Sequence, residues 1–277
     1  MIKYFLLTST VVAILLGSLS TSSAQNGSAL QFTGFQYATR ATPISVLQNN
    51  ITMQCWVKWD GTNGGNVMRI YYNGNSNNSG YGIVTQAGTQ NIGLLVGFFA
   101  ITYSTTPLIA NTWQHLALVR NAGAWSLYVN GIVTTLASGA TPNVPTAPNG
   151  ILGSSIFNES FQGVIDEVSF FSTPISGANI LAYKDVPISA GHPNFANLVA
   201  YYQLNEGSGQ IAGSGGAGLD LTLGSTAGVD ANDPTWTTTV APLVPTLGEW
   251  GMIIFGLSII GIGVWFVNKR GKFGVAV

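Results

Sequence analysis

Two adjacent carboxylates, Asp166 and Glu167 in FQGVIDEVSFF, are the residues of this sequence that come nearest to a catalytic pair. A retaining glycosidase needs two carboxyl groups about 5 Å apart, on either side of the bond that it cleaves. Residues i and i+2 of a strand can supply such a pair because they share a face, but no Glu-x-Asp-x-Glu or similar pattern occurs here. Asp166 and Glu167 are direct neighbours, and a regular strand turns neighbours to opposite faces. The spacing therefore argues against a glycosidase.

The other residue types that act as nucleophiles, bases or metal ligands are equally sparse. His115 lies in the strand-like stretch WQHLALVR, where a packed, hydrogen-bonded histidine is the usual role. His192 lies in a Gly-His-Pro turn, with no partner visible in the sequence. Cys55 is the only cysteine, so an intramolecular disulfide and a Cys/His metal site are both excluded. We therefore expect no enzymatic activity.

The elements that would position these residues are strands. ITMQCWVKW alternates with period two, which places Ile51, Met53, Cys55, Val57 and Trp59 on one face. Further strand-like stretches are NVMRIYYN, YGIVTQ, NIGLLVGFFAITY, WQHLALVR, AWSLYVNG and FQGVIDEVSFF. Only SGANILAYKD is typical of a helix, with Ser176 as its N-cap. Many strands, regular turns and one short helix predict an all-β, antiparallel β-sandwich.

Four stretches resemble LamG-like domains of the concanavalin A-like lectin/glucanase group. They are ALQFTGFQY, ITMQCWVKW, NTWQHLALVR with WSLYVNG, and FQGVIDEVSFF, and they follow one another in the family's order from Ala29 to Tyr183. The resemblance implies a jelly roll of two curved antiparallel sheets, which we assign to residues 25–228. It also implies that Asp166 and Glu167 are structural, satisfying backbone groups at a strand end.

The stretch Leu198–Ser225 resembles a segment that often opens such a domain, yet here it follows the matching motifs. It would either close the sandwich as a permuted edge strand or be the remnant of a second repeat. A lone remnant would expose the apolar strand LVAYY at an edge, which promotes aggregation. Closure of the sandwich is therefore the favoured interpretation.

Two ligand sites are considered, each beside an ordinary alternative. Some relatives hold calcium at a rim loop, and Asp60, Asn73, Asn75 and Asn77 would offer oxygens for it, although Asn and Gly also simply form turns. An aromatic platform for sugar rings could use Tyr71, Tyr72, Tyr81, Phe98, Phe99 and Tyr103. About half of these rings must face the core because of strand alternation. Apart from calcium we expect no cofactor.

Both ends of the chain carry targeting features. Residues 1–24 have an early lysine, an apolar stretch and small residues before a cleavage point between Ala24 and Gln25, which is the pattern of a secretory signal peptide. Near the other end, Trp250 to Asn268 are uncharged and would form a helix about 28 Å long, enough to cross a bilayer. The basic residues that follow, beginning with Lys269 and Arg270, predict a cytoplasmic tail. The alternative is a buried core helix.

The residues before this helix resemble a known sorting signal. Pro245, Thr246, Leu247, Glu249 and Trp250 match the IPTL-CTERM signal of Gram-negative bacteria, whereas Val244 replaces the usual isoleucine. The resemblance covers residues 245–277 and implies recognition and cleavage by an exosortase-like membrane enzyme, whereas a plain membrane anchor is the alternative. Residues 229–244 are expected to be a Pro/Thr linker, extended and without regular ladder hydrogen bonds.

The charge balance narrows the function classes. Between Gln25 and Pro245 there are five basic and nine acidic residues with no basic stripe, so nucleic acid is not an expected partner. We predict an exported, non-enzymatic surface or matrix module that binds a polysaccharide or a surface protein. It would pass through an inner-membrane intermediate to the cell surface or the extracellular space. The alternatives are a structural surface-layer or biofilm matrix protein and, more distantly, a glycoside hydrolase.

Overall fold

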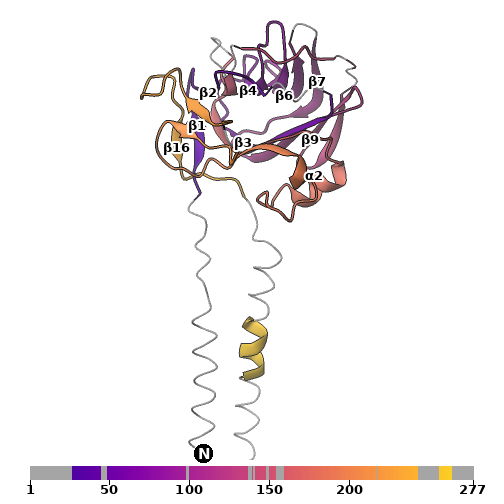
Figure 1. Ribbon diagram of the computed structural model, residues 1–277, viewed down its shortest axis with the longest axis vertical. Helices are drawn as coiled ribbons and strands as arrows, with labels where there is room; N and C mark the ends of the chain where they lie inside the picture. Colours follow the sequence, from indigo (N-terminus) through magenta and orange to yellow (C-terminus); the bar gives the residue numbers. More distant parts are fainter. Residues whose placement is uncertain are drawn as a thin grey trace, which may run out of the picture.

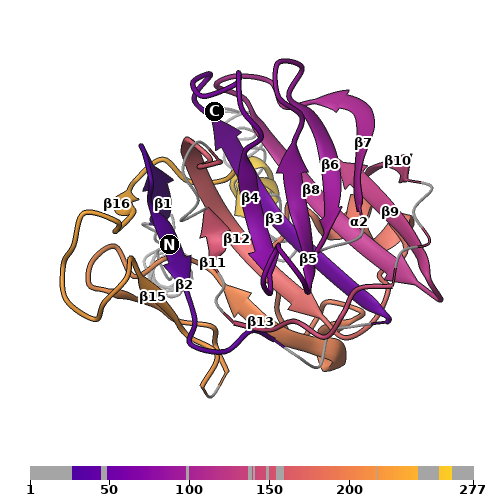
Figure 2. The same cartoon turned by 90° about the horizontal axis from the view of Figure 1, so that it is seen from above.

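The fold is a sandwich of two antiparallel β-sheets, as the sequence predicts. The computed structural model describes residues 27–44, 49–97, 100–136, 139, 141–147, 150–153, 159–216, 218–242 and 256–263. In Figure 1 the sheet that contains β4, β6 and β7 lies above the sheet that contains β3 and β9, and helix α2 lies beneath the second sheet. Figure 2 shows the same two layers from above.

The first sheet, called sheet A, has the strand order β10-β9-β8-β3-β12-β1-β16, and β13 also pairs with β12. Its strands are β1 (Ala29–Phe32), β3 (Ile51–Trp59), β8 (Trp113–Asn121), β9 (Ala124–Val129), β10 (Ile132–Leu136), β12 (Gly163–Phe171), β13 (Leu198–Tyr202) and β16 (Thr235–Thr237).

The second sheet, sheet B, has the order β14-β15-β2-β11-β4-β5-β6-β7. Its strands are β2 (Tyr37–Thr39), β4 (Arg69–Asn73), β5 (Tyr81–Thr85), β6 (Asn91–Val96), β7 (Ala100–Pro107), β11 (Gly150–Gly153), β14 (Ile211–Ala212) and β15 (Leu221–Leu223).

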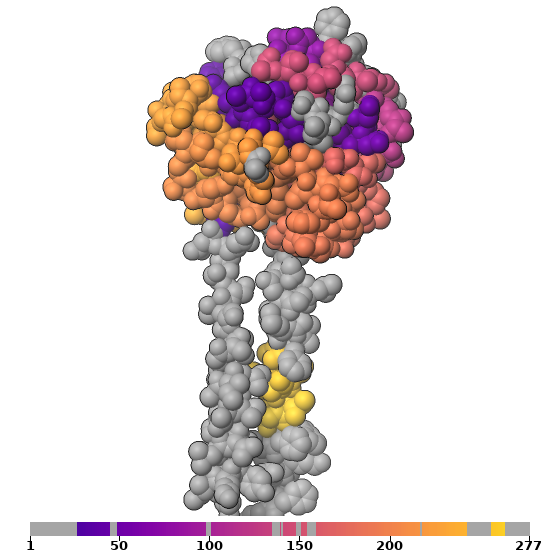
Figure 3. Space-filling model, viewed as in Figure 1, coloured from indigo at the N-terminus to yellow at the C-terminus, as the bar shows by residue number. Residues whose placement is uncertain are grey.

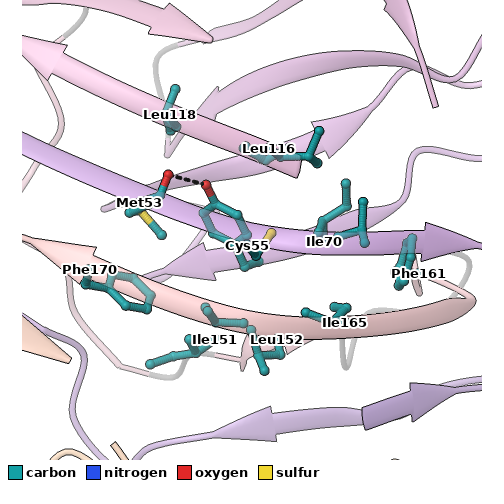
Figure 4. Packing of buried hydrophobic residues seen from close by; sticks show 14 of the residues in the cluster. Met53, Cys55, Ile70, Leu116, Leu118, Ile151, Leu152, Phe161, Ile165 and Phe170 are labelled. Atoms are coloured by element: carbon teal, nitrogen blue, oxygen red, sulfur yellow. Dashed lines mark hydrogen bonds between the residues drawn. The ribbon is translucent and has the colours of Figure 1, made fainter. Parts of the chain in front are cut away.

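Strand β3 shows how the alternating pattern builds the core. All five residues predicted to share one face, from Ile51 to Trp59, belong to the main hydrophobic cluster between the sheets. Figure 4 shows Met53 and Cys55 of β3 packed with residues of the facing sheet. The hydroxyl of Tyr71 in β4 donates a hydrogen bond to the carbonyl of Met53 at 2.9 Å, so the two sheets are also joined by a buried polar contact.

The predicted helix is α2 (Gly177–Tyr183), and Ser176 is its N-cap, as predicted. The Ser176 side chain accepts a hydrogen bond from the backbone N–H of Asn179 at 3.2 Å. Ile180 of α2 is buried against Ala117 and Phe171 in a second apolar cluster, which is separate from the core between the sheets. The helix therefore covers part of the outer face of sheet A.

The segment Leu198–Ser225 closes the sandwich rather than standing apart from it. Strand β13 pairs with β12 in sheet A, and β15 pairs with β2 in sheet B. A 3₁₀ turn, η1 (Phe195–Asn197), leads into β13. Because the segment adds strands to both sheets, six of its residues are buried in the same core as the motifs that precede it, namely Ala200, Tyr202, Leu204, Ala212, Leu221 and Leu223.

Part of the expected linker at 229–244 is a strand, which corrects the prediction of an extended segment without ladder hydrogen bonds. Thr235–Thr237 form β16, which pairs with β1 in the register Ala29 with Thr237. The pairing was missed because β1 lies far away in sequence and offers a free edge only once the sandwich has formed. It also places the start and the end of the folded domain side by side.

The targeting predictions fall largely outside the described residues. These include Ala24 and Gln25, the motif Pro245, Thr246, Leu247, Glu249 and Trp250, and the basic residues Lys269 and Arg270. Of the expected membrane helix 250–268, residues 256–263 are described, and they are helical. Within the described part of the chain, no helix has the length and apolar character needed to cross a bilayer. The signal peptide, membrane helix and sorting signal thus stay predictions.

Candidate binding groove beside strand β13

Asp166 and Glu167 lie on the same face of sheet A, which corrects the prediction that they point to opposite faces. Ile165 and Val168, which flank them, both belong to the core between the sheets. The two carboxylates between them are therefore both directed away from that core. The pairing of β12 with β3 shifts register between Asp166 and Ser169, and Glu167 has a φ of 52°. The cause is a β-bulge, which inserts an extra residue and breaks the alternation.

Asp166 has the structural role that the family resemblance implies. One carboxylate oxygen accepts a hydrogen bond from the backbone N–H of Glu167 at 2.9 Å, and the other accepts one from Ala241 at 2.8 Å. The residue is only 3% exposed. Burial raises the pKa of Asp166 to about 7, although the two N–H donors act in the opposite direction.

Glu167 is joined to strand β13. Its carboxylate accepts a hydrogen bond from the hydroxyl of Tyr201. Burial raises the pKa of Glu167 to about 8, the charge of Asp166 adds to this rise, and the Tyr201 hydrogen bond opposes it. The bulge thus holds the Tyr201 hydroxyl with a half-buried carboxyl group whose pKa is raised.

Tyr201 in turn forms part of a groove of about 460 Å³, a volume within the range of small-molecule sites. The groove is lined by Ile188, Phe195, Leu198, Tyr201, Gln203, Asn205, Glu206, Gly213, Ser214 and Gly215. All of these residues come from the segment after α2, which forms the orange lower part of the domain in Figure 3.

The groove combines an apolar surface with polar side chains that are held in place. Phe195 is 43% exposed and offers a ring to a ligand. Glu206 accepts a hydrogen bond from the N–H of Gly213 at 2.7 Å, and Asn205 accepts one from Ser28 at 3.2 Å. Gln203, two residues after Tyr201, also lines the groove. Such an arrangement can bind a ring with one apolar face and hydroxyl groups around its edge.

The tyrosines predicted as a sugar platform are mostly unavailable. Tyr71 and Tyr81 are fully buried in the core between the sheets, so they are corrected from ligand contacts to core residues. Tyr72 is 2% exposed, and its hydroxyl donates to the carbonyl of Ser79. Tyr103 is half-buried, with its ring against Gly93, where an added Cβ would approach Tyr103 Cδ1 to 2.5 Å. Phe98 and Phe99 lie outside the described residues.

The residues predicted to hold calcium are used mainly as turn acceptors. A carboxylate oxygen of Asp60 accepts from the N–H and the hydroxyl of Thr62, and the side-chain oxygen of Asn75 accepts from the N–H of Asn77. Asn73 is fully buried, and its amide exchanges hydrogen bonds with the backbone of Ile44. Asp60 follows β3 in sheet A, whereas Asn73 ends β4 in sheet B. Calcium binding at these residues stays a prediction.

The histidines and the cysteine are packed side chains. Burial, with a smaller effect of the Lys184 charge, lowers the pKa of His115 to about 3, and its ring lies 5.4 Å from that of Trp56. His192, for which the sequence showed no partner, accepts a hydrogen bond from the N–H of Asn194 and lies 4.9 Å from the ring of Tyr183. Cys55 is buried and unpaired. Among the described residues, no three His, Cys, Asp or Glu side chains gather closely enough to hold a metal.

The family model named Laminin_G_3, of the concanavalin A-like lectin/glucanases superfamily, matches residues 32–181. The chain belongs to this superfamily. The matched region contains the bulge and α2 but ends before the groove segment, so the family match does not itself describe the groove. No curated protein matches the chain.

A solved structure shares the fold at low sequence identity, and others superpose less closely. A putative carbohydrate-binding protein from Bacteroides ovatus superposes with a TM-score of 0.62 and 18% identity, covering 79% of this chain. The chain spans 61% of that structure's length. A heptameric SAP-like pentraxin from Limulus polyphemus has a TM-score of 0.48 and 14% identity, covering 66% of this chain and 94% of its own. A CBM40 domain of a Ruminococcus gnavus sialidase has a TM-score of 0.43 and 16% identity, covering 56% of this chain and 98% of its own.

The groove residues were missed although the sequence carries a signal for them. In AYYQLNE, Ala200, Tyr202 and Leu204 belong to the core, so Tyr201, Gln203 and Asn205 alternate with it. A period-two interpretation of this stretch would have placed the three side chains on one face. The rest of the groove comes from η1 and from the loop before β15, and only the fold brings these together.

Proposed function

We propose that the protein is a non-enzymatic lectin-like module that binds a carbohydrate in the groove beside β13. The observation that supports this proposal is the exposed ring of Phe195 in one groove with Gln203 and Glu206. The Bacteroides ovatus protein of the same fold is described as a putative carbohydrate-binding protein, and this ligand class is carried over here only as part of the proposal.

The chemistry of the groove favours a neutral, hydroxylated sugar. A pyranose ring has an apolar C–H face that packs on an aromatic side chain, and amide and carboxylate groups suit its hydroxyls. Among the described lining residues none is Lys or Arg, and Glu206 contributes the one carboxylate. A uronic acid or another anionic sugar would meet that carboxylate without a compensating cation.

The same groove lacks the arrangement needed to cleave a glycosidic bond. Hydrolysis by the usual mechanism requires two carboxyl groups that both reach the bond. Glu206 is alone among the described lining residues, and both oxygens of Asp166 accept backbone hydrogen bonds away from the groove. Glu167 does not line the groove, and its carboxylate accepts a hydrogen bond from Tyr201, which does.

We also propose that the module is exported and routed to the cell surface by its C-terminal signal. This proposal is supported by the pairing of Ala29 with Thr237, which brings together two strands that lie four positions after the predicted cleavage point at Gln25 and eight positions before the predicted sorting motif at Pro245 in the sequence. The partner in this step would be an exosortase-like membrane enzyme.

The proposal of carbohydrate binding is tested with a matched pair of phenylalanine variants. Phe195 and Phe35 are 43% and 44% exposed, but only Phe195 lines the groove. The full chain is screened on a glycan array, and binding of the strongest neutral hit is measured by calorimetry. We expect Phe195→Ala to weaken binding about tenfold or more, a loss of roughly 1.4 kcal/mol, and Phe35→Ala to bind as the unaltered protein does.

Two outcomes would overturn the proposal. Equal affinity of both variants would place the sugar elsewhere on the domain. An array without hits would favour the structural matrix protein, whose surface serves no specific ligand. Release of reducing sugar from a bound glycan would instead show that the protein is an enzyme.

A further inference from the structure

Two carboxylates that do not line the groove, those of Asp230 and Asp233, converge in the loop between β15 and β16. Gly224 has a φ of +65°, and a Cβ added there would collide with Oδ1 of Asp233 and lie 2.7 Å from Oδ1 of Asp230. The two oxygens therefore lie close to one another beside the backbone of Gly224. Only glycine leaves this space open.

Asp233 carries a buried oxygen without a donor. The residue is 9% exposed, and its Oδ2 accepts a hydrogen bond from the N–H of Asp230 at 2.9 Å. Its Oδ1 is buried and has no hydrogen-bond partner. Burying a carboxylate oxygen without a hydrogen-bond donor costs free energy, because the oxygen loses its water and gains no partner. A ligand at this position would supply the missing partner.

Asp230 adds a second negative charge at the same place. Its Oδ2 accepts hydrogen bonds from the N–H and hydroxyl of Ser225 at 3.0 and 2.6 Å, and its Oδ1 accepts one from the N–H of Asn232 at 2.8 Å. The ion pairs formed by the described residues are Arg69 with Glu159 and Lys184 with Asp185. Neither pair brings a cation to this loop, so the negative charge of its carboxylates is not balanced by one of them.

We propose that this loop binds a calcium ion through the carboxylates of Asp230 and Asp233. Calcium prefers carboxylate, carbonyl, hydroxyl and water oxygens, whereas zinc prefers the nitrogen and sulfur ligands that this loop lacks. The ion supplies the positive charge that the two carboxylates need and a partner for Oδ1 of Asp233. This site is distinct from the rim residues Asp60, Asn73, Asn75 and Asn77.

Calcium at this position would secure the C-terminal closure of the sandwich. The loop is hydrogen-bonded to β2 on both sides, because Tyr37 donates to the carbonyl of Asn232 at 3.1 Å and accepts from Gly224 at 2.8 Å. Strand β16 begins two residues after Asp233. An ion that holds Asp230 and Asp233 together therefore stabilises the attachment of the loop to β2 and the start of β16.

The test uses the purified full chain in detergent, first stripped with EGTA. Terbium is the probe, because it substitutes for calcium and emits when excited through a nearby tryptophan, here Trp236. We expect terbium emission that calcium competes away, and a rise in melting temperature when calcium is returned. Asp233→Asn should abolish both signals, whereas Asp220→Asn, which alters a carboxylate of the same segment that accepts from Ser214, should retain both.

Each alternative result overturns the site. The proposal fails if the unaltered protein gives neither signal, if Asp233→Asn keeps both, or if Asp220→Asn loses them to the same extent. Circular dichroism reports whether each variant is folded, and Asp230→Asn takes the place of Asp233→Asn if the latter does not fold. Loss of both signals in Asp60→Asn with retention in Asp233→Asn would assign calcium to the rim loop instead.

Discussion

The carboxylate of Asp166 accepts a hydrogen bond from the backbone N–H of Ala241 at 2.8 Å, across 75 positions of sequence. This contact fastens the last part of the domain to the bulge of β12. Ala241 is 6% exposed, and only three residues separate it from the predicted sorting motif at Pro245. One buried side chain thus anchors the residues that precede the predicted C-terminal signal.

Replacement of Asp166 should lower stability rather than remove an activity. In Asp166→Ala the N–H groups of Glu167 and Ala241 lose their acceptor inside the protein, at an expected cost of roughly 1–3 kcal/mol in the free energy of unfolding. Denaturant unfolding followed by fluorescence measures this change. Asp60→Ala serves as the control. Because Asp60 is exposed, this replacement should lower the free energy of unfolding by about 0.5 kcal/mol or less. An unchanged midpoint together with lost glycan binding would contradict the structural role.

Stability should fall as the pH rises from about 6.5 to about 8. Burial raises the pKa of Asp166 from 3.8 to about 7 and that of Glu167 from 4.5 to about 8. The folded state therefore holds protons that the unfolded chain has lost, and this stabilisation disappears as the pH passes through the folded-state values. Below pH 6.5, the contribution of His115 to stability rises with pH, because burial lowers the pKa of His115 from 6.5 to about 3.

The variant Glu167→Gln isolates the carboxyl contribution to this pH dependence. Glutamine keeps an oxygen that accepts from Tyr201 but cannot ionise. Melting temperatures measured between pH 6 and pH 9 should decline less steeply in the variant than in the unaltered protein. A stability that rises with pH over this range, or an identical decline in both proteins, would contradict the prediction.

The tail should be processed, not retained as an anchor. Replacing Pro245, Thr246, Leu247, Glu249 and Trp250 with Gly and Ser leaves the apolar stretch, Lys269 and Arg270 intact. Because Asp166 holds Ala241, the predicted motif begins only four positions after a residue that is anchored to the domain. Fractionation should then show full-length protein accumulating in the inner membrane and absent from the surface. Peptides from Trp250 to Lys269 in the mature protein from unaltered cells would show that the helix is a permanent anchor.

Local patterns predicted much of the fold because they depend on neighbouring residues. The alternation in β3 identified which of its residues enter the core, and Ser176 identified the start of α2. The four ordered motifs predicted the superfamily that the family model confirms. Each of these inferences concerns a few consecutive residues whose periodicity or capping chemistry is visible in the chain itself.

The bulge at Asp166 and Glu167 and the strand β16 show where such inference ends. A bulge inserts one residue into a pairing, so whether two adjacent side chains share a face depends on the partner strand, here β3. Likewise Thr235–Thr237 form a strand only because β1 offers them an edge. Neither the shifted register nor the free edge can be inferred from the sequence of the residues concerned.

The candidate binding groove likewise depends on contacts that the local sequence does not show. The sequence by itself determined an all-β domain with few catalytic residue types, a neutral-to-acidic charge balance and targeting patterns at both ends. It also supplied the alternation of Tyr201, Gln203 and Asn205 with core residues, but it did not bring Phe195 or Ser214 beside them. Only the tertiary structure gathered these side chains into a groove and buried Tyr71 and Tyr81, because burial and proximity arise from contacts between segments distant in the chain.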